Sequence, residues 1–304
     1  MAVFTTFSRP ALERYIIMFG LGELATFEAI ETGIENSNYF VTLESGDEFV
    51  LTITEHLGFE DVPFFNELFA QLTRSGLPVP DPARTLDGMT STIFCGKPAW
   101  LFPKLPGGHP LMPDSGQCQT IGGALARLHA AAMSTRYKRG NPYDVEWARE
   151  ALQTKGELLE KADSLMLETI LAEYQELGQG STDLPTGIIH GDLFRDNALF
   201  EGNILTGIID FYHACEDFLV QDIAITINDW CMTAEGLTDR ARMTALISGY
   251  ESIRKLTNEE SRTLSLFRRN AALRFTLTRL LSGDEGDHLK DPEEFLKIAR
   301  SLYR

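Results

Sequence analysis

The chain has 304 residues, of which 43% are hydrophobic and 23% are charged, which is typical of a globular protein with a substantial core. Its formal net charge of −17 argues against nucleic acid and anionic membrane surfaces as partners, because both repel a polyanion. The four cysteines lack metal-ligand spacing, the N-terminus lacks a signal-peptide pattern, and no apolar run approaches ~20 residues, so we expect a cytoplasmic chain with reduced thiols.

Residues 1–102 are predicted to form a small, β-rich N-terminal lobe, since a length near 300 residues accommodates about two domains. A helix is expected to begin at Ser8, a residue type that caps helices well, and to continue to Phe19, after which glycines end it. Apolar, β-prone segments then predict the strands of an antiparallel sheet, at 27–30, 39–43 and 49–53.

A polar loop that contains glycine, at residues 33–38, joins the first two of these strands. Its backbone N–H groups and the side chains of Asn36, Ser37 and Asn38 are suited to donate hydrogen bonds to phosphate oxygens. The alternative is a plain hairpin loop. Phosphate binding is favoured only by the position of the loop ahead of the motif described below.

The rest of this lobe is predicted to hold a second helix and two more strands. The helix runs from Asp61 to Gly76, with Glu67 near its middle, and strand-like segments follow at 83–86 and 98–102. At 103–107 the apolar chain changes to Pro103-Lys104-Leu105-Pro106-Gly107, and this proline and glycine content predicts a hinge between two lobes.

Residues 108–304 are predicted to form a larger, mainly helical lobe, because apolar residues recur there at helical spacing. His129, near the end of the first of these helices, is expected to be a packed structural group rather than a catalyst. The expected helices lie at 114–132, within 144–177, from 217 onward, and at 238–250, 259–281 and 292–303, and a surface loop is expected at 282–288.

Within this lobe, two short apolar strands each end in the polar side chains that phosphoryl transfer requires. One strand precedes His190-Gly191-Asp192, and after Asn197 a second apolar run leads to Asp210. Protein kinases use this order of base, amide and second carboxylate, with the last two binding Mg²⁺. Asp192 is therefore a candidate catalytic base, and Asn197 and Asp210 are candidate metal ligands. Turn chemistry explains each residue singly but not the ordered set.

These two stretches resemble the aminoglycoside phosphotransferase and choline kinase superfamily, and other segments resemble its bacterial homoserine kinases. The segments are 33–41, 61–65, 76–80, 210–215, 228–231 and 272–280, so the resemblance spans nearly the whole chain. It implies an α+β protein-kinase-like fold of two lobes. It also implies an ATP- and Mg²⁺-dependent enzyme that phosphorylates the hydroxyl of L-homoserine, a step of threonine biosynthesis.

The resemblance implies roles for further residues. The loop at 36–38 would cover the nucleotide phosphates, and the hinge would bind adenine through the carbonyl of Pro103 and the N–H of Leu105. A proline permits this assignment, since it keeps its carbonyl and lacks only the N–H. Asp222 corresponds to an aspartate that supports the catalytic loop.

Two positions depart from the kinase pattern. Thr52 stands where protein kinases place a strand lysine, which leaves Glu67 without an obvious cationic partner. Homoserine kinases of this type resemble this sequence in lacking the lysine, so we do not interpret its absence as loss of activity. Arg195 stands where relatives often carry proline. It is a candidate to stabilise the transferring phosphoryl group, and the alternative is pairing with Asp196 or solvent.

The acceptor pocket for homoserine needs a cation for the carboxylate and an acid or carbonyls for the ammonium. Arg274 and Arg279 are candidates for the cation, although structural pairing with acids of the larger lobe is favoured for both. Asp217 and Asn228 follow the metal aspartate closely enough to line the pocket, as does Asp229, and His213 is a weaker candidate.

Other functions are compatible with the sequence at this point. The chain is also interpretable as a kinase for another small alcohol, such as an aminoglycoside, choline or methylthioribose. A nucleotide-binding pseudokinase is suggested by the missing lysine and opposed by the intact Asp192, Asn197 and Asp210. A small-molecule binder without nucleotide leaves the ordered motif unexplained, and the oligomeric state is not predicted.

Overall fold

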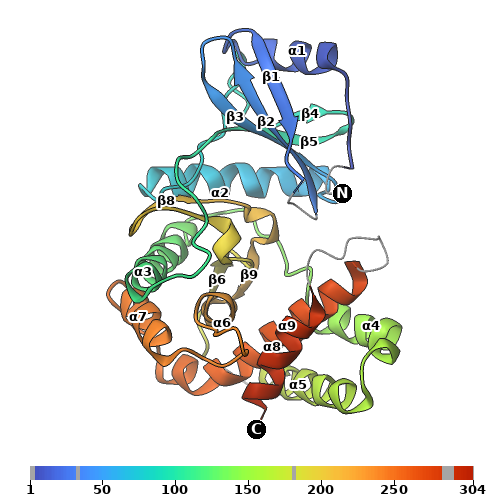
Figure 1. The fold of residues 1–304 in the computed structure, drawn as a ribbon, viewed down its shortest axis with the longest axis vertical. Coiled ribbons are helices and arrows are strands. Elements are labelled where there is room, and N and C mark those ends of the chain that lie inside the picture. The colour runs from blue at the N-terminus through green and yellow to red at the C-terminus, as the bar shows by residue number, and fades with distance from the viewer. Residues whose placement is uncertain (1–3, 32–34, 180–182, 283–290, 304) are drawn as a thin grey trace. The chain divides into compact units, whose positions relative to one another are not determined.

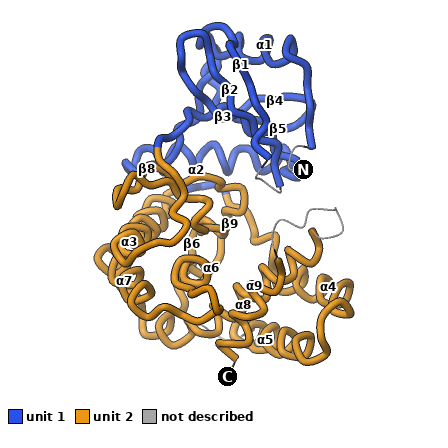
Figure 2. The backbone as a smooth tube through the Cα atoms, viewed as in Figure 1, with its two compact units in different colours: residues 1–106, 135–137 blue, residues 107–134, 138–304 orange. Residues whose placement is uncertain are grey.

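The protein is described by a computed structural model that covers residues 4–31, 35–179, 183–282 and 291–303. It divides into two compact units (Figure 2). Unit 1 consists of residues 1–106 and 135–137, and unit 2 consists of residues 107–134 and 138–304. The surface loop expected at 282–288 lies, apart from its first residue, outside the described residues.

Unit 1 is built on a five-stranded sheet in the order β1-β2-β3-β5-β4, in which neighbouring strands are antiparallel (Figure 1). The strands are β1 (Leu24–Ala29), β2 (Asn36–Leu43), β3 (Glu48–Thr54), β4 (Thr92–Phe94) and β5 (Lys97–Pro103). Because side chains alternate along a strand, the sheet has two distinct faces. Leu51 and Leu101 pack on one face with α1 (Arg9–Ile17), whereas Trp100 and Phe102 pack against Phe65 and Phe69 of α2 (Val62–Arg74).

Two expectations for unit 1 are wrong. Residues 36–38 begin β2 instead of lying in the loop before it, because they pair in register with residues 52–54 of β3. The segment 83–86 is not a strand. Ala83 donates its N–H to the carbonyl of Leu101 at 2.8 Å, but β4 is the strand that pairs with β5 on this side.

Unit 2 is mainly helical, and α6 (Leu219–Trp230) lies at the centre of its helices in Figure 1. Nearly every residue of α6 is buried, as expected of a helix surrounded on all sides. Around it lie α3 (Ser115–Ala132), α7 (Arg240–Glu251) and α8 (Asn258–Ser282), and α8 in turn packs against α4 (Val145–Lys155), α5 (Lys161–Gln179) and α9 (Pro292–Leu302). None of the helices in the described part of the chain has the length and apolar character needed to span a membrane.

Two antiparallel strand pairs in unit 2 carry the kinase-like motif. β6 (Thr186–Ile189) pairs with β9 (Cys215–Phe218), and β7 (Ala198–Glu201) pairs with β8 (Ile204–Ile208). Strand β9 was not predicted from the sequence, which instead indicated a helix from residue 217. That helix begins instead at Leu219, because Asp217 and Phe218 pair with Gly187 and Thr186.

Candidate active site

One buried carboxylate fixes the backbone of the loop that follows β6. Asp222, on α6, accepts the N–H of His190 at 2.7 Å and the N–H of Gly191 at 2.9 Å. It also lies 3.1 Å from Nε2 of His129, whose Nδ1 is 2.7 Å from the hydroxyl of Tyr250. Burial alone would raise the pKa of Asp222, but the bond to His129 and the proximity of His190 lower it. Asp222 therefore supports the loop as a charged acceptor, and His129 is the packed structural group that we expected.

His190 links the loop of Asp192 to the segment before Asp210 through hydrogen bonds. Its Nε2 lies 3.1 Å from the carbonyl oxygen of Ile209, and its Nδ1 accepts the N–H of Asp192 at 3.2 Å. These two partners require the neutral tautomer with the proton on Nε2. Burial lowers the pKa of His190 to about 4, although the charge of Asp222 opposes this shift, so the imidazole is neutral at pH 7.

The candidate base and one candidate metal ligand are in direct contact. Nδ2 of Asn197 donates to the carbonyl oxygen of Asp192 at 2.8 Å and to its carboxylate oxygen at 3.0 Å. Asn197 ends a short 3-10 helix, η3 (Arg195–Asn197), which returns its side chain to the start of the loop. Because the amide nitrogen is bound to Asp192, the amide oxygen is the atom of Asn197 that suits a metal ion.

Asp210, the second candidate metal ligand, has a left-handed backbone with φ 61° and ψ 64°. Aspartate is among the few residues other than glycine that adopt this conformation. The preceding residue, Ile209, donates its N–H to the carbonyl of Asn197 at 3.0 Å and accepts from His190. The structure therefore brings the segments of Asp192, Asn197 and Asp210 together.

The side-chain oxygens of Asn197 and Asp210 fit Mg²⁺, which commonly binds one or two protein oxygens and completes its shell with phosphates and water. Among the described residues, no group of three or more His, Cys, Asp or Glu side chains could hold a metal by itself. A metal bound by Asn197 and Asp210 would complete its shell with nucleotide phosphates and water.

Arg274, on α8, contacts both halves of the motif. Its Nη1 donates to the carbonyl of Gly191 at 2.7 Å, and its Nη2 lies 3.0 Å from Nδ1 of His213. The guanidinium lies 4.1 Å from the ring centre of Tyr143 and 4.6 Å from that of Phe275. Arg274 is thus held by a carbonyl, an imidazole and two rings, and the acid with which it interacts is Asp217, where burial raises the pKa of the carboxyl group and the charge of Arg274 opposes that shift. Its buried Nε has no hydrogen-bond partner in the described structure.

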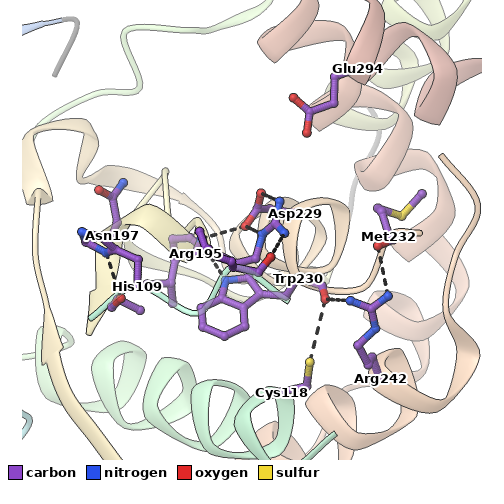
Figure 3. A network of polar contacts seen from close by, with 12 residues as sticks. His109, Cys118, Arg195, Asn197, Asp229, Trp230, Met232, Arg242 and Glu294 are labelled. Carbon is purple, nitrogen blue, oxygen red and sulfur yellow. Dashed lines mark hydrogen bonds and ion pairs between the residues drawn. The ribbon is translucent and has the colours of Figure 1, made fainter. Parts of the chain in front are cut away.

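Arg195 is bound by Asp229 of α6 (Figure 3), and the charge of Asp196, which the sequence offered as an alternative partner, also acts on its guanidinium. Its Nε and Nη2 donate to the two carboxylate oxygens at 3.0 and 3.2 Å, and its backbone N–H donates to the same carboxylate at 2.7 Å. Nη1 donates to the carbonyl of Leu111 at 2.8 Å. Asp229 raises the pKa of Arg195 through this pairing, although burial opposes the shift.

Two further acceptor candidates are engaged elsewhere in unit 2. Asn228 donates to the carbonyl of Arg268 at 2.7 Å and accepts from its Nε at 2.9 Å, inside the helical core. Arg279 pairs with Glu294 at 2.7 Å, which is the structural pairing that the sequence analysis favoured. These contacts show how both side chains are held.

Residues 138–143, to which the sequence analysis assigned no role, contact the segment that follows Asp210. Nη1 of Arg139 donates to the carbonyls of Tyr212 and Ala214, both at 3.1 Å. Asn141 donates to the carboxylate of Asp217 at 2.6 Å, and burial raises the pKa of that carboxyl group. The only sequence signal was a polar, proline-containing connection between two predicted helices, which is too general to indicate such contacts.

In unit 1, the side chains of residues 36–38 alternate between the two faces of β2. The hydroxyl of Ser37 is fully buried, accepts two backbone N–H groups of the N-terminal segment at 2.9 and 2.8 Å, and donates to Glu55 at 2.5 Å. Asn38 lies on the other face and accepts the hydroxyl of Thr52 at 2.7 Å. The Ser37 side chain is therefore committed to holding the N-terminal segment, whereas Asn36 shares the face of Asn38 and Thr52.

Glu67 does have a cationic partner, contrary to expectation. Its carboxylate accepts from Nε of Arg136 at 2.9 Å and from the backbone N–H groups of Arg136 and Tyr137 at 2.7 and 3.0 Å. The partner was missed because it lies 69 residues away in the chain, after α3. At the other end of unit 1, Pro103 closes β5 opposite Phe49, and Leu105 follows it outside the strand.

Comparison with known proteins gives consistent results. The model of the phosphotransferase enzyme family matches residues 26–256. A homoserine kinase of Pseudomonas aeruginosa (strain UCBPP-PA14) is 40% identical over 299 residues, which cover 97% of this chain and 94% of that protein. A homoserine kinase of Neisseria meningitidis serogroup B is 37% identical and covers 99% of this chain and 100% of its own length.

Among solved structures, an amicoumacin kinase in complex with AMP-PNP and Ca²⁺ superposes with a TM-score of 0.73. It is 18% identical in sequence and covers 97% of this chain and 92% of its own. This likeness concerns the fold, and it confirms the α+β kinase-like class that the sequence predicted.

Proposed function

The chain belongs to the phosphotransferase enzyme family and, within it, to the homoserine kinases, and we propose that it transfers the γ-phosphate of MgATP to the hydroxyl of L-homoserine. The observation that carries this proposal is the contact between Asp192 and Asn197. Asp222 holds the backbone immediately before Asp192 by two hydrogen bonds. A biosynthetic kinase that consumes ATP is expected in the cytoplasm.

Asp192 acts in this proposal as the base. The hydroxyl oxygen of the acceptor forms a bond to the γ-phosphorus, the bond between that phosphorus and the β,γ-bridging oxygen breaks, and ADP leaves. Asp192 accepts the hydroxyl proton, while the amide of Asn197 holds the carboxylate in position. Asn197 and Asp210 would hold the Mg²⁺, which would neutralise charge on the phosphates when bound.

Nucleotide contacts in unit 1 are assigned by the family resemblance. We assign phosphate contact to Asn36 and Asn38, and to the backbone of Ser37, because the Ser37 hydroxyl holds the N-terminal segment. We assign adenine contact to the carbonyl of Pro103 and the N–H of Leu105.

For the acceptor, Arg274 is the candidate that the contacts support best. It binds the carbonyl immediately before Asp192, and its buried Nε is a donor without a partner in the described structure. A carboxylate is the ligand that such a donor suits. Asp217 is retained for the ammonium group, while the contacts of Asn228 and Arg279 favour structural roles for both.

The decisive experiment measures ADP release from MgATP with L-homoserine, L-serine, choline, methylthioribose and kanamycin as acceptors. We expect homoserine-dependent turnover, and we expect Asp192→Asn to lower kcat by about 10²–10⁴-fold while nucleotide still binds. Turnover only with choline or a sugar would assign the protein to another kinase of the family. Nucleotide binding without turnover for any acceptor would identify a pseudokinase.

A further inference from the structure

The carboxylate of Glu67 holds a stretch of chain that is distant in sequence. One of its oxygens, Oε2, accepts the backbone N–H groups of both Arg136 and Tyr137, at 2.7 and 3.0 Å. The other, Oε1, accepts the Arg136 side chain, which is 84% exposed. Exposed ion pairs contribute little, so the two backbone hydrogen bonds are the stronger part of this contact. They explain why residues 135–137 belong to unit 1 although their neighbours belong to unit 2.

Residues 139–141, which follow this stretch, contact the segment after Asp210 at several points. Arg139 donates to the carbonyls of Tyr212 and Ala214 and accepts the N–H of Glu216 at 2.8 Å. Gly140 bridges to Glu216 in parallel, and further along Asn141 binds Asp217. These contacts run from the second to the seventh residue after Asp210.

Glu67 holds residues 136 and 137, and residues 139–141 contact the segment after Asp210. Lys138 is the one residue between these two parts of the connection. Its side chain pairs with Glu216 as well. We propose that Glu67 is a positioning residue for the candidate metal ligand Asp210, and that it acts by accepting the backbone N–H groups of residues 136 and 137. Its carboxylate fixes the connection, and the connection fixes the backbone at 212–216. This inference rests on the proposed function of Asp210.

The proposal gives Glu67 a different task from that of the helix glutamate in protein kinases, which pairs with a strand lysine. Thr52 occupies the position of that lysine and binds Asn38 instead. If Glu67 served as a charge, glutamine would replace it no better than alanine. If it serves as a backbone acceptor, the single amide oxygen of glutamine keeps both N–H bonds.

The test uses the full chain and three variants: Glu67→Ala, Glu67→Gln and Arg136→Ala. ADP affinity is measured by calorimetry, without acceptor, at increasing Mg²⁺ concentrations. The readout is the Mg²⁺ concentration that gives half of the total increase in ADP affinity. We expect Glu67→Ala to raise that concentration about five- to tenfold, near the lower end of the effect of outer-shell residues on metal sites. Glu67→Gln and Arg136→Ala should stay within about twofold of the parent chain, because both keep the backbone bonds.

An unchanged Mg²⁺ requirement in Glu67→Ala would overturn the proposal, and so would a Glu67→Gln variant as impaired as Glu67→Ala. Arg139→Ala removes the two side-chain hydrogen bonds to the carbonyls of Tyr212 and Ala214 at the other end of the connection and should raise the Mg²⁺ requirement in the same direction. If Glu67→Ala does not fold, a normal requirement in Arg139→Ala overturns the proposal. Because no acceptor is present, these outcomes are independent of whether homoserine is the substrate.

Discussion

Arg195 binds Asp229 through its backbone and its guanidinium, and this pairing decides what its substitution should do. We expect Arg195→Ala and Asp229→Ala each to lower kcat by about tenfold and to lower the melting temperature, because each loosens the loop of Asp192. The double variant should be little worse than either single one, since residues in one network couple by about 0.5–3 kcal/mol. Steady-state kinetics and thermal melts of the three variants measure this coupling.

The competing role for Arg195 predicts a different pattern. An arginine that acts directly on the transferring phosphoryl group contributes about 10³–10⁵ in kcat. A loss of that size in Arg195→Ala, with Asp229→Ala nearly unaffected, would show that the pairing with Asp229 is incidental. Arg195→Lys is a useful control, because lysine lacks the planar fork that meets both carboxylate oxygens.

His190 makes the stability of the protein depend on acid pH. Its pKa is lowered to about 4 by burial, so between about pH 6.5 and pH 4 the unfolded chain binds a proton that the folded chain does not. Stability is therefore complete above about pH 6.5 and falls as pH decreases towards 4, by on the order of 3 kcal/mol. Urea unfolding at several pH values measures this loss.

The matched control is His190→Gln, which should be less stable at pH 7 but should lose the dependence on pH within that window. Asp222 does not confound the measurement. Its pKa is lowered from an ordinary value near 4, so its contribution is lost below the window in which His190 titrates. Burial also raises the pKa of Asp217 and Asp229, whose effect on stability in this window has the opposite sign and is common to both proteins, so an equal pH dependence of the parent and of His190→Gln would contradict the assignment of a neutral, buried His190.

At the scale of elements, helices α3 and α7 cross at glycines. A Cβ atom on Gly122 would lie 2.0 Å from the carbonyl oxygen of Leu246, and one on Gly249 would lie 2.0 Å from that of Gln119. Both contacts are with backbone, which cannot turn aside. We expect Gly122→Ala to lower the free energy of unfolding by about 3 kcal/mol, at the upper end of the usual effect of overpacking.

The neighbouring glycine is the control. A Cβ on Gly123 would lie 3.5 Å from the carbonyl oxygen of Gly249, which is ordinary contact, so Gly123→Ala should be neutral or should stabilise the helix by about 0.5–1 kcal/mol. Denaturant unfolding of the two variants measures the difference. Equal effects of the two substitutions would show that the helices separate easily at this crossing.

The elements that sequence predicted well are those whose pattern is local and long. Helix α3 was expected at 114–132 and spans 115–132, where Asp114 caps it by accepting the N–H of Gln117 at 2.8 Å. The short strands β4 and β9 were missed because three or four residues carry no usable period. What makes β9 a strand is its partner β6, about thirty residues earlier in the chain.

At the scale of the whole molecule, the parts of the site also divide into those with a local sequence pattern and those that depend on residues distant in the chain. The spacing from Asp192 to Asn197 is local, so sequence identified both residues, and the structure places them in contact. The carboxylate that holds the backbone just before Asp192 comes from a distant part of the chain, because Asp222 accepts the N–H groups of His190 and Gly191. The partner of Glu67 is 69 residues away and that of Arg195 is 34 residues away, and a single sequence gives no signal for choosing among many acids and bases at such separations.

The net charge also acts on the whole molecule, and it predicts how salt changes stability. With 44 acidic and 27 basic residues, the folded chain repels itself. Salt screens this repulsion, since the Debye length falls from about 30 Å at 0.01 M to about 10 Å at 0.1 M. Salt also weakens exposed ion pairs such as Arg9–Glu13, but such pairs contribute only about 0–1 kcal/mol each.

Relief of the repulsion should therefore exceed the loss of surface pairs. We expect the melting temperature at pH 7.5 to rise by about 1–2 °C between 10 and 300 mM NaCl, which corresponds to about 1 kcal/mol for a chain of this size. Calorimetric scans at both salt concentrations measure the shift, and potassium chloride in place of sodium chloride controls for an effect specific to one cation. A melting temperature that falls with salt would mean that the ion pairs dominate. In that case the excess of acids would have to be spread so widely over the surface that its self-repulsion is already weak at 10 mM salt.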